Sequence, residues 1–278
     1  MCSTLFGLAG PQTRTGGTTV SSEAPEVHEM IPAERRARIV DLVKERRAVR
    51  VSALSEDLGV SGMTIRRDLE RLEAEGVLVR THGGAVLKRH MTEETLYVER
   101  ESASTEEKRR IAEAAATLIE PGDTVFLSSG TTAAQVIRHI DPSLEARVVT
   151  HNVGAVQEAR GLRVEVVLVG GLYRPRSNAV SGPLALEQIA RFHAGKMLIG
   201  VDGFDLEEGM TTPTMSMASV ERAMVAATRG EVIALADNSK IGVVADVVIC
   251  GLDQVDTVLV DDGADAQVRE ELARLGLR

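Results

Sequence analysis

The chain has 278 residues, which is enough for two domains with sizeable cores. Its net charge of −9 excludes a general basic coat for binding nucleic acid. Residues 31–90 nevertheless carry 13 basic and 9 acidic side chains, whereas the whole chain has 32 and 41. We therefore expect one modestly basic module joined to an acidic body.

The cysteine content and the hydropathy exclude several further classes of protein. Cys2 and Cys250 are too few for a disulfide framework or a cysteine-based metal site, and we expect neither a metal nor another cofactor. No apolar run is long enough to cross a membrane, and the chain does not start like a secretory signal. We expect a cytoplasmic protein without a membrane partner.

The N-terminal third begins with a polar tail and continues with three helices. Residues 1–30 are rich in Gly, Ser, Thr and Pro and predict a disordered tail, and Met30 is an alternative start. Helical spacing predicts helices over 33–46 and 51–58, separated from a third helix by a turn at Gly59.

The third helix starts after Ser61, which can cap its first turn, and it ends near Gly76. Ile65, Leu69 and Leu72 fall on one face and predict its buried side. Met63 and Arg67 point the other way, and Thr64 and Arg66 lie on the flanks. A helix that offers Thr and two Arg in its first turns suits the DNA major groove.

Two short β runs around a Gly pair follow the third helix and predict a hairpin over 77–87. Three helices and a hairpin make residues 31–88 a winged helix-turn-helix domain. The expected DNA-binding residues are Ser61, Met63, Thr64, Arg66, Arg67, Arg80 and His82. An exposed amphipathic helix with solvated arginines, and a hairpin that does not touch DNA, are the alternatives.

A polar stretch, 89–103, is expected to link this domain to a second one at 104–278. Ser104 to Glu107 has capping-box spacing and predicts the start of a helix that runs to Leu118. Strands and helices then alternate, which predicts an α/β domain with a mostly parallel sheet. The expected strands are 123–127, 146–150, 163–169, 195–200, 231–235, 246–250 and 256–260, and the expected helices are 132–140, 153–160, 183–191, 216–228 and 264–275.

Ligands of such sheets bind beyond the carboxyl ends of the strands, where this chain places polar and small residues. The loop from Ser128 to Thr132 leads a buried strand into a helix, and exposed amides at a helix N-terminus suit phosphate. Lys240 follows another strand and could neutralise that phosphate. An ordinary strand–helix turn and a surface lysine are the alternatives. The expected effector-binding residues at strand ends are Ser128, Ser129, Gly130, Thr131, Thr132, Thr150, Asn152, Gly170, Gly171, Asp202 and Lys240.

The first domain has a recognisable pattern at Arg35, Ile39 and Val43, at Ser61, at 64–69 and at 80–85. In these residues it resembles the DNA-binding domain of DeoR-family transcription regulators. The second domain resembles the sensor domain of the same family, which is similar in fold to phosphosugar isomerases of the ribose-5-phosphate isomerase type. That resemblance rests on Lys108, Ile111-Ala112, the Ser-Gly-Thr-Thr loop, Thr150-His151-Asn152, Gly170-Gly171, Gly209-Met210-Thr211, Glu221 and Asp237-Asn238-Ser239-Lys240.

The resemblance adds Glu221 to the effector-binding residues and implies a sensor of a phosphorylated sugar or related metabolite. The chain departs from the family pattern at Ser128, where members usually have Asp, and at Thr150-His151-Asn152, where they more often have Thr-Asn-Ser. The loss of the Asp removes a carboxylate that could hold a sugar hydroxyl.

Together, these patterns predict a sequence-specific regulator, a repressor of carbohydrate metabolism genes whose binding to double-stranded operator DNA is controlled by a small phosphorylated metabolite. One winged domain makes too small an interface for tight binding, so we expect a homodimer or homotetramer. The alternative is a sugar-phosphate isomerase-like enzyme with a DNA-binding appendage. A purely architectural DNA protein would leave the anion loop unexplained.

Overall fold

A computed structural model describes residues 30–46, 48–81, 83–87, 89–264 and 266–277. Residues 1–29 of the expected tail at 1–30, and the predicted DNA contact His82, lie outside these residues. No helix in the described part of the chain is long and apolar enough to cross a membrane.

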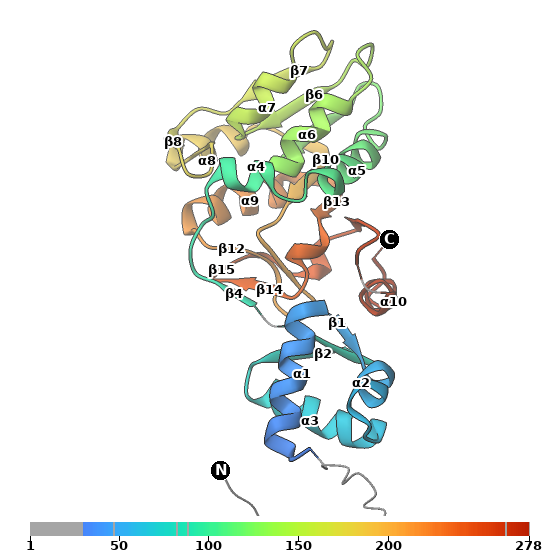
Figure 1. The fold of residues 1–278 in the computed structure, drawn as a ribbon. Helices are drawn as coiled ribbons and strands as arrows, with labels where there is room; N and C mark the ends of the chain where they lie inside the picture. Colours follow the sequence, from blue (N-terminus) through green and yellow to red (C-terminus); the bar gives the residue numbers. More distant parts are fainter. Residues whose placement is uncertain (1–29, 47, 82, 88, 265, 278) are drawn as a thin grey trace, which may run out of the picture. The chain divides into compact units, whose positions relative to one another are not determined.

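The first domain is a winged helix-turn-helix, as the sequence predicts (Figure 1). Its elements are α1 (Pro32–Arg46), β1 (Ala48–Arg50), α2 (Val51–Leu58), α3 (Gly62–Ala74), β2 (Leu78–Thr81) and β3 (Gly84–Leu87). The predicted hairpin is β2–β3, and the sequence analysis missed β1, which pairs antiparallel with β3. Ile39, Leu54, Ile65 and Leu69 form a common buried core.

The turn between α2 and α3 has the predicted geometry. Gly59 ends α2 with a φ of 64°, a conformation that glycine adopts without steric cost. Two residues later, the Ser61 hydroxyl accepts a hydrogen bond from the Thr64 amide at 3.2 Å. This bond satisfies one of the free amides at the start of α3. The two caps together fix where the recognition helix begins.

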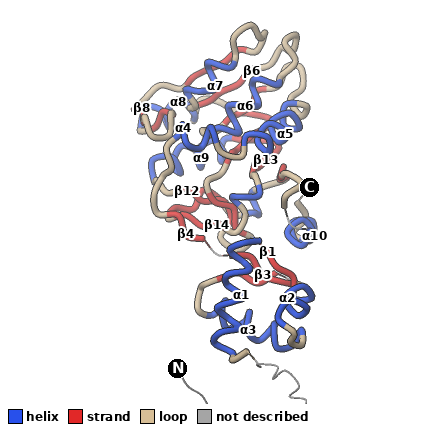
Figure 2. Tube along the Cα trace, viewed as in Figure 1, coloured by secondary structure: helices blue, strands red, loops and turns tan. Residues whose placement is uncertain are grey.

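The second domain contains both helices and strands, which are coloured blue and red in Figure 2. Its six-stranded sheet is entirely parallel, so it is an α/β domain. The strand order is β16-β13-β10-β5-β6-β7. The bounds are β5 Thr124–Leu127, β6 Arg147–Thr150, β7 Glu165–Leu168, β10 Ala194–Gly200, β13 Thr228–Ala236 and β16 Thr257–Val260. Each of these strands lies where the sequence predicts one, within a few residues.

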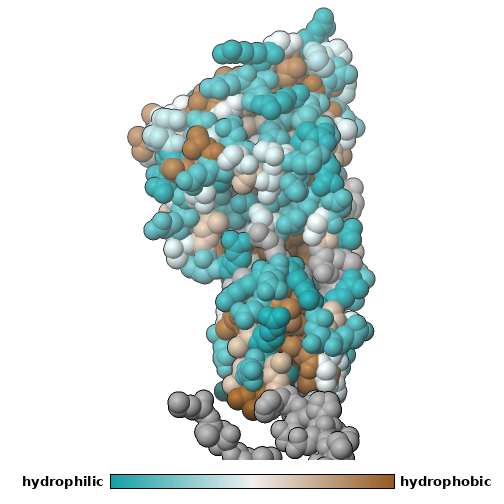
Figure 3. All heavy atoms as spheres, viewed as in Figure 1, coloured by the Kyte–Doolittle hydropathy of each residue, from teal (hydrophilic) through white to brown (hydrophobic). Residues whose placement is uncertain are grey.

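Helices cover both faces of this sheet. Alternate residues of its strands point to opposite sides, and apolar residues on each side are buried against helices. Val125 and Leu127 pack on the side of α5 (Thr105–Ala116) and α6 (Thr131–His139). Phe126 packs on the opposite side, against α8 (Pro183–Ile189) and α9 (Met215–Ala227). The other α-helices described after Ser104 are α7 (Val153–Glu158) and α10 (Ala266–Arg274). Hydrophilic residues predominate on the face that Figure 3 shows.

The strand predicted at 246–250 is present as β15 (Val247–Cys250), but it lies outside the main sheet. It pairs antiparallel in a separate sheet with β12 (Gly209–Thr212), which also pairs with β11 (Gly203–Asp205). One prediction about this domain is wrong. The predicted capping box at Ser104 does not form, because Ser104 has a left-handed φ of 48° and its side chain caps no amide. The sequence analysis also missed β8 (Leu172–Arg174), β9 (Ala179–Ser181), η1 (Asn238–Lys240), β14 (Val243–Ala245) and η2 (Leu252–Gln254).

The stretch expected to be a linker contains a strand and a helix. β4 (Arg89–Met91) pairs in parallel with β14, which follows η1 closely in the chain. α4 (Tyr97–Ser102) follows β4 after a short turn. Between them, Glu94 is buried, its carboxylate accepts a hydrogen bond from the Ser177 hydroxyl, and its carbonyl accepts one from Arg176 Nε at 2.7 Å. The segment is therefore anchored to the α/β domain along its length.

Candidate functional sites: a DNA-reading helix and an anion pocket

Helix α3 buries one face and exposes the other, as its amphipathic pattern predicts. Ile65, Leu69 and Leu72 are buried in the first domain. The Met63 side chain is 59% exposed, and Arg66 and Arg67 are also exposed. The exposed face of α3 begins with a polar cap and carries two arginines. These side chains can contact bases and phosphates in a major groove.

A buried ion pair fixes α3 against α1. Arg35 Nε lies 2.6 Å from Asp68 Oδ2, and Arg36 Nη1 lies 3.6 Å from Asp68 Oδ1. The Asp68 side chain is 7% exposed, so it lies inside the domain rather than toward DNA. Its role is to hold the recognition helix in place, in agreement with its sequence position between the apolar residues of the helix.

Arg80, a predicted DNA contact on strand β2, is engaged within the domain. Its Nη1 lies 3.2 Å from Glu70 Oε1 and 3.8 Å from Glu73 Oε2, both on α3. A DNA phosphate would have to compete with these two carboxylates for the guanidinium group. Arg80 therefore ties the wing to the recognition helix in the structure described here.

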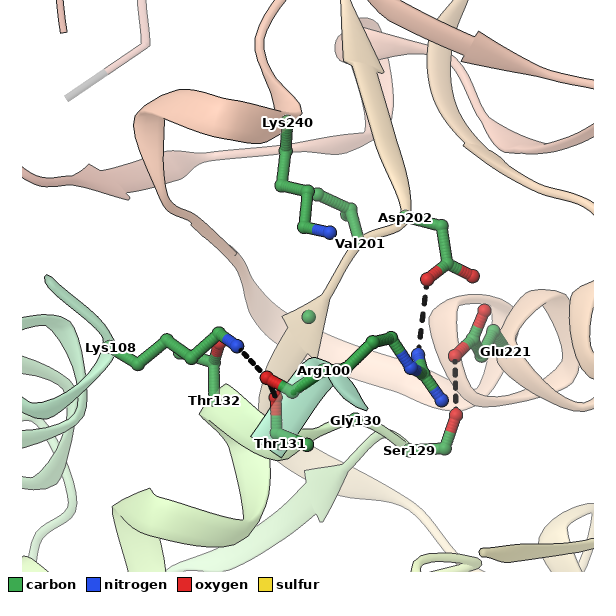
Figure 4. Close-up of a pocket in the computed structure, with 11 residues that line it drawn as sticks. Arg100, Lys108, Ser129, Gly130, Thr131, Thr132, Val201, Asp202, Glu221 and Lys240 are labelled. Atoms are coloured by element: carbon green, nitrogen blue, oxygen red, sulfur yellow. Dashed lines mark hydrogen bonds and ion pairs between the residues drawn. The ribbon is translucent and has the colours of Figure 1, made fainter. Parts of the chain in front are cut away.

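The α/β domain contains a pocket at the carboxyl ends of β5 and β10 (Figure 4). This is the edge of a parallel sheet where ligands bind. Its lining consists of Arg100, Lys108, Ser129, Gly130, Thr131, Thr132, Gly200, Val201, Asp202, Glu221 and Lys240. Seven of the twelve predicted effector-binding residues belong to this lining: Ser129, Gly130, Thr131, Thr132, Asp202, Glu221 and Lys240.

The loop between β5 and α6 forms one wall of the pocket. Gly130 precedes α6 with a φ of 120°, a value that favours glycine, and Thr131 and Thr132 form the first turn. The first amides of a helix have no acceptor within it, and the helix dipole places partial positive charge there. This wall is therefore suited to bind an anion such as phosphate.

The last residue of β6 and the two residues that follow it support this loop from behind. The Thr150 hydroxyl donates to the Leu127 carbonyl at 2.7 Å, and Asn152 Nδ2 donates to the Gly130 carbonyl at 2.9 Å. His151 Nε2 accepts a hydrogen bond from the Ser129 amide at 2.9 Å. Thr150 and Asn152, both predicted effector contacts, are thus buried supports outside the lining of the pocket.

His151 has a structural role beneath the loop. It is fully buried, and burial lowers its pKa to about 4, so the ring is neutral at physiological pH. Since Nε2 accepts from the Ser129 amide, Nδ1 carries the proton and donates to the Val180 carbonyl at 3.1 Å. The Ser129 amide is therefore already engaged, and it is not available to bind an anion.

Three other predicted residues also lie outside the pocket lining. Ser128 is buried, and its hydroxyl accepts from the Gly200 amide at 2.8 Å and donates to the Ser129 carbonyl. It thereby joins the ends of β5 and β10. The Gly170 amide donates to Gln188 Oε1. A Cβ at Gly171 would lie 2.6 Å from the Ser181 carbonyl oxygen, so close packing requires this glycine.

Two carboxylates in the pocket differ in their surroundings. Asp202 Oδ1 lies 3.1 Å from Arg100 Nη1, and its Oδ2 accepts a hydrogen bond from the Thr212 hydroxyl at 2.8 Å. Glu221 is buried and accepts from the Ser129 hydroxyl at 3.3 Å. Burial, followed by the negative charge of Asp202, raises the pKa of Glu221 well above its ordinary value.

Lys108 and Arg100 line the pocket although neither was a predicted site residue. Lys108 Nζ donates to the Ala103 carbonyl at 2.7 Å and to the Arg100 carbonyl, which ties α4 to α5. Burial lowers the pKa of Lys108 to about 8. Lys108 shares a helix face with Ile111, Ala112 and Ala115, so a lysine on an apolar face was a usable signal. Arg100, in the expected linker, had no such signal.

A winged helix-turn-helix domain joined to an α/β domain with a polar pocket defines a class of protein, the DNA-binding regulators that carry a small-molecule sensor. Among the residues that the structure describes, no group of His, Cys, Asp or Glu side chains could hold a metal ion.

Comparison with known proteins identifies the family. Residues 35–90 match the DeoR-like helix-turn-helix domain, and residues 103–262 match the DeoR C terminal sensor domain. The chain is 36% identical over 248 residues to the HTH-type transcriptional regulator GlpR of Haloferax volcanii, covering 89% of this chain and 97% of that protein. It is 31% identical over 235 residues to the HTH-type transcriptional repressor GlcR of Bacillus subtilis, covering 84% and 89%. The chain belongs to the DeoR family of transcriptional regulators.

The chain also has a distant similarity to a solved structure. Ribose 5-phosphate isomerase A from Methanocaldococcus jannaschii is 17% identical and aligns with 50% of this chain and 55% of that chain, with a TM-score of 0.38.

Proposed function

We propose that this DeoR-family protein represses genes of carbohydrate metabolism and that a phosphorylated sugar or related metabolite controls its binding to double-stranded operator DNA. The observation that carries the proposal is the pocket, where Arg100, Lys108 and Lys240 meet the N-terminus of α6. Three cationic side chains beside free helix amides are suited to a phosphate group. A protein that binds chromosomal DNA works where the DNA is, so we place it in the cytoplasm.

On the DNA side, the proposal gives the exposed residues of α3 different tasks. Arg67 binds the two acceptors of a guanine, because an arginine fits this pair of atoms bidentately. Arg66 binds a backbone phosphate, and Met63 packs against a thymine methyl group. Ser61 and Thr64 stand at the helix start, where side chains meet base edges or phosphates. Since one such domain buries little surface, the active form is a homodimer or homotetramer.

On the sensor side, the phosphate group binds at Thr131 and Thr132 with Lys108 and Lys240 as counter-ions. The sugar hydroxyls face Asp202 and Glu221. A carboxylate accepts hydrogen bonds, whereas a protonated carboxyl also donates one, so the raised pKa of Glu221 lets the two groups recognise different hydroxyl partners. Control requires that the effector bind the DNA-incompetent arrangement more tightly than the competent one.

The proposal is tested in two assays on the full chain. Fluorescence anisotropy with DNA from upstream of its own gene should show salt-sensitive, sequence-selective binding. Thermal unfolding with a panel of pentose and hexose phosphates should show stabilisation by some of them and not by the unphosphorylated sugars. Binding to all DNA sequences alike, or stabilisation by none of the phosphates, would contradict the proposal.

A further inference from the structure

We propose that Arg100, on the segment between the two domains, is an anion-binding residue of the effector pocket, and that Asp202 orients it for this task. The inference rests on the proposed function, because it assigns a residue and a route of control to the same pocket. It makes the interdomain segment itself part of the effector site.

The hydrogen bonding of Arg100 carries the inference. The side chain is 13% exposed, and its Nη1 lies 3.1 Å from Asp202 Oδ1. Its Nε and Nη2 are buried and have no hydrogen-bond partner among the described residues. Buried guanidinium N–H groups without acceptors are costly, so their arrangement indicates that a partner is missing. Arg100 also lines the pocket, where such a partner would bind.

The two unpartnered atoms share one edge of the guanidinium group. Nε–H and Nη2–H point the same way and together form the fork that binds a carboxylate or phosphate through two parallel hydrogen bonds. The bond from Nη1 to Asp202 uses the other side of the group (Figure 4). The Tyr97 ring, whose centroid lies 5.9 Å from Arg100 Cζ, restricts the side chain further.

Asp202 is itself held in position, which makes it suited to orient Arg100. Its second oxygen accepts a hydrogen bond from the Thr212 hydroxyl at 2.8 Å. A carboxylate fixed at both oxygens gives the guanidinium group one orientation before any ligand arrives. An anion then binds without the entropy cost of ordering a free arginine side chain.

One end of the interdomain segment lines the pocket, and the other end pairs with β14, the strand that follows Lys240 in the chain. At one end, α4 carries Arg100, whose carbonyl accepts a hydrogen bond from Lys108. At the other end, β4 pairs with β14, and the Arg89 amide donates to the Gly242 carbonyl, two residues after Lys240. An anion held by Arg100 and Lys240 therefore contacts the segment that leads into the DNA-binding domain, without an intermediate element.

The test is a titration of the full chain with inorganic phosphate at constant ionic strength, followed by thermal unfolding. Arg100→Gln should weaken apparent phosphate affinity by about 10-fold to 100-fold, the range expected for a charge-assisted bidentate contact. Arg100→Lys keeps the charge but lacks the fork, so it should lose several-fold. Arg138→Gln is the matched control, because Arg138 forms an exposed pair with Glu158 and lies outside this pocket.

A double-mutant cycle separates orientation by Asp202 from a general effect on folding. Asp202→Asn should weaken phosphate binding in the wild-type background and have no further effect in the Arg100→Gln background. Hydrogen exchange gives a second readout: phosphate should slow amide exchange in α4 of the wild type and not of Arg100→Gln. Additive effects, or equal slowing in both proteins, would overturn the inference.

The outcomes also distinguish this inference from the proposed function. If phosphate does not stabilise the wild type, the anion pocket and the role of Arg100 are both wrong. If phosphate stabilises the wild type and Arg100→Gln alike, the pocket binds anions and only the role of Arg100 is wrong.

Discussion

The ion pair between α1 and α3 gives the sharpest prediction about the DNA-binding domain. Asp68→Asn keeps the shape of the side chain and removes its charge beside Arg35. The two side chains are 10% and 7% exposed, and their atoms lie 2.6 Å apart. Removing one partner of a buried pair costs ~3–5 kcal/mol. Because Asn keeps one acceptor oxygen, we expect the lower end, about 3 kcal/mol.

The same domain contains a matched control. Arg46 and Asp57 also lie 2.6 Å apart, but their side chains are 46% and 37% exposed. Water and salt screen such a pair, so Asp57→Asn should cost roughly 0.5 kcal/mol. The two substitutions therefore make the same chemical change at equal distance from the nearer arginine. They differ in burial and in the second arginine near Asp68, Arg36, at 3.6 Å.

Native-state hydrogen exchange measures both effects within the domain. Asp68→Asn should raise the opening equilibrium of α3 amides about 100-fold or more, whereas Asp57→Asn should raise it about twofold. DNA affinity should fall with Asp68→Asn, because the recognition helix loses its anchor. If both variants change exchange by the same small factor, burial does not set the strength of this pair, and the assigned role of Asp68 is wrong.

Three further predictions concern the two sites. Arg67→Gln should cost about 1–3 kcal/mol of binding free energy at the preferred operator and relax the selectivity for its sequence. Arg66→Gln should instead weaken binding to all DNA sequences and reduce the slope of log affinity against log salt concentration by about one. Anisotropy titrations at several salt concentrations would measure both effects. Burial lowers the pKa of Lys108 to about 8, so phosphate affinity should fall as the pH rises above 8 and this side chain loses its charge. Lys108→Gln should remove this pH dependence. Phosphate titrations of both proteins between pH 8 and 9.5 would test the prediction. Because the pKa of Glu221 is raised, the folded protein keeps a proton that the unfolded chain loses above the ordinary carboxyl pKa. The wild type should therefore lose thermal stability relative to Glu221→Gln as the pH rises from 4 to 8. A difference in Tm that stays constant with pH would contradict the assignment.

Local patterns were sufficient to predict the first domain. The Ser61 cap, the left-handed turn at Gly59 and the apolar face of α3 each depend on residues close together in the chain. Strand β1 was missed because its three residues pair with β3, far along the sequence. The main sheet was predictable for a similar reason, since its strands are continuous apolar runs. The separate β11–β12–β15 sheet was not, because strand composition does not specify the pairing partner.

The pocket was predicted in outline, because the carboxyl ends of parallel strands meet at one edge of a sheet. Sequence position placed Thr131, Thr132 and Lys240 at this edge, and the structure places them in the pocket lining. It did not reveal that Thr150 and Asn152 turn inward to support the loop, because this depends on carbonyl positions that only the folded loop defines.

Arg100 was unpredictable for a further reason. It lies in a polar stretch, and its importance comes from Asp202, which is about one hundred residues away in the chain. No local periodicity or strand-end rule brings the two together. The capping box at Ser104 shows the opposite error, since its spacing was right and the backbone adopts a conformation that prevents the cap.

The central claim is that one pocket in the α/β domain controls DNA binding by the winged domain. Anisotropy titration of labelled upstream DNA, repeated with each member of a sugar-phosphate panel and with the matching unphosphorylated sugars, tests it most directly. The account predicts that a phosphorylated sugar which stabilises the protein also weakens selective DNA binding, and that Lys240→Gln removes this response. DNA binding that stays the same with every stabilising ligand would contradict the account.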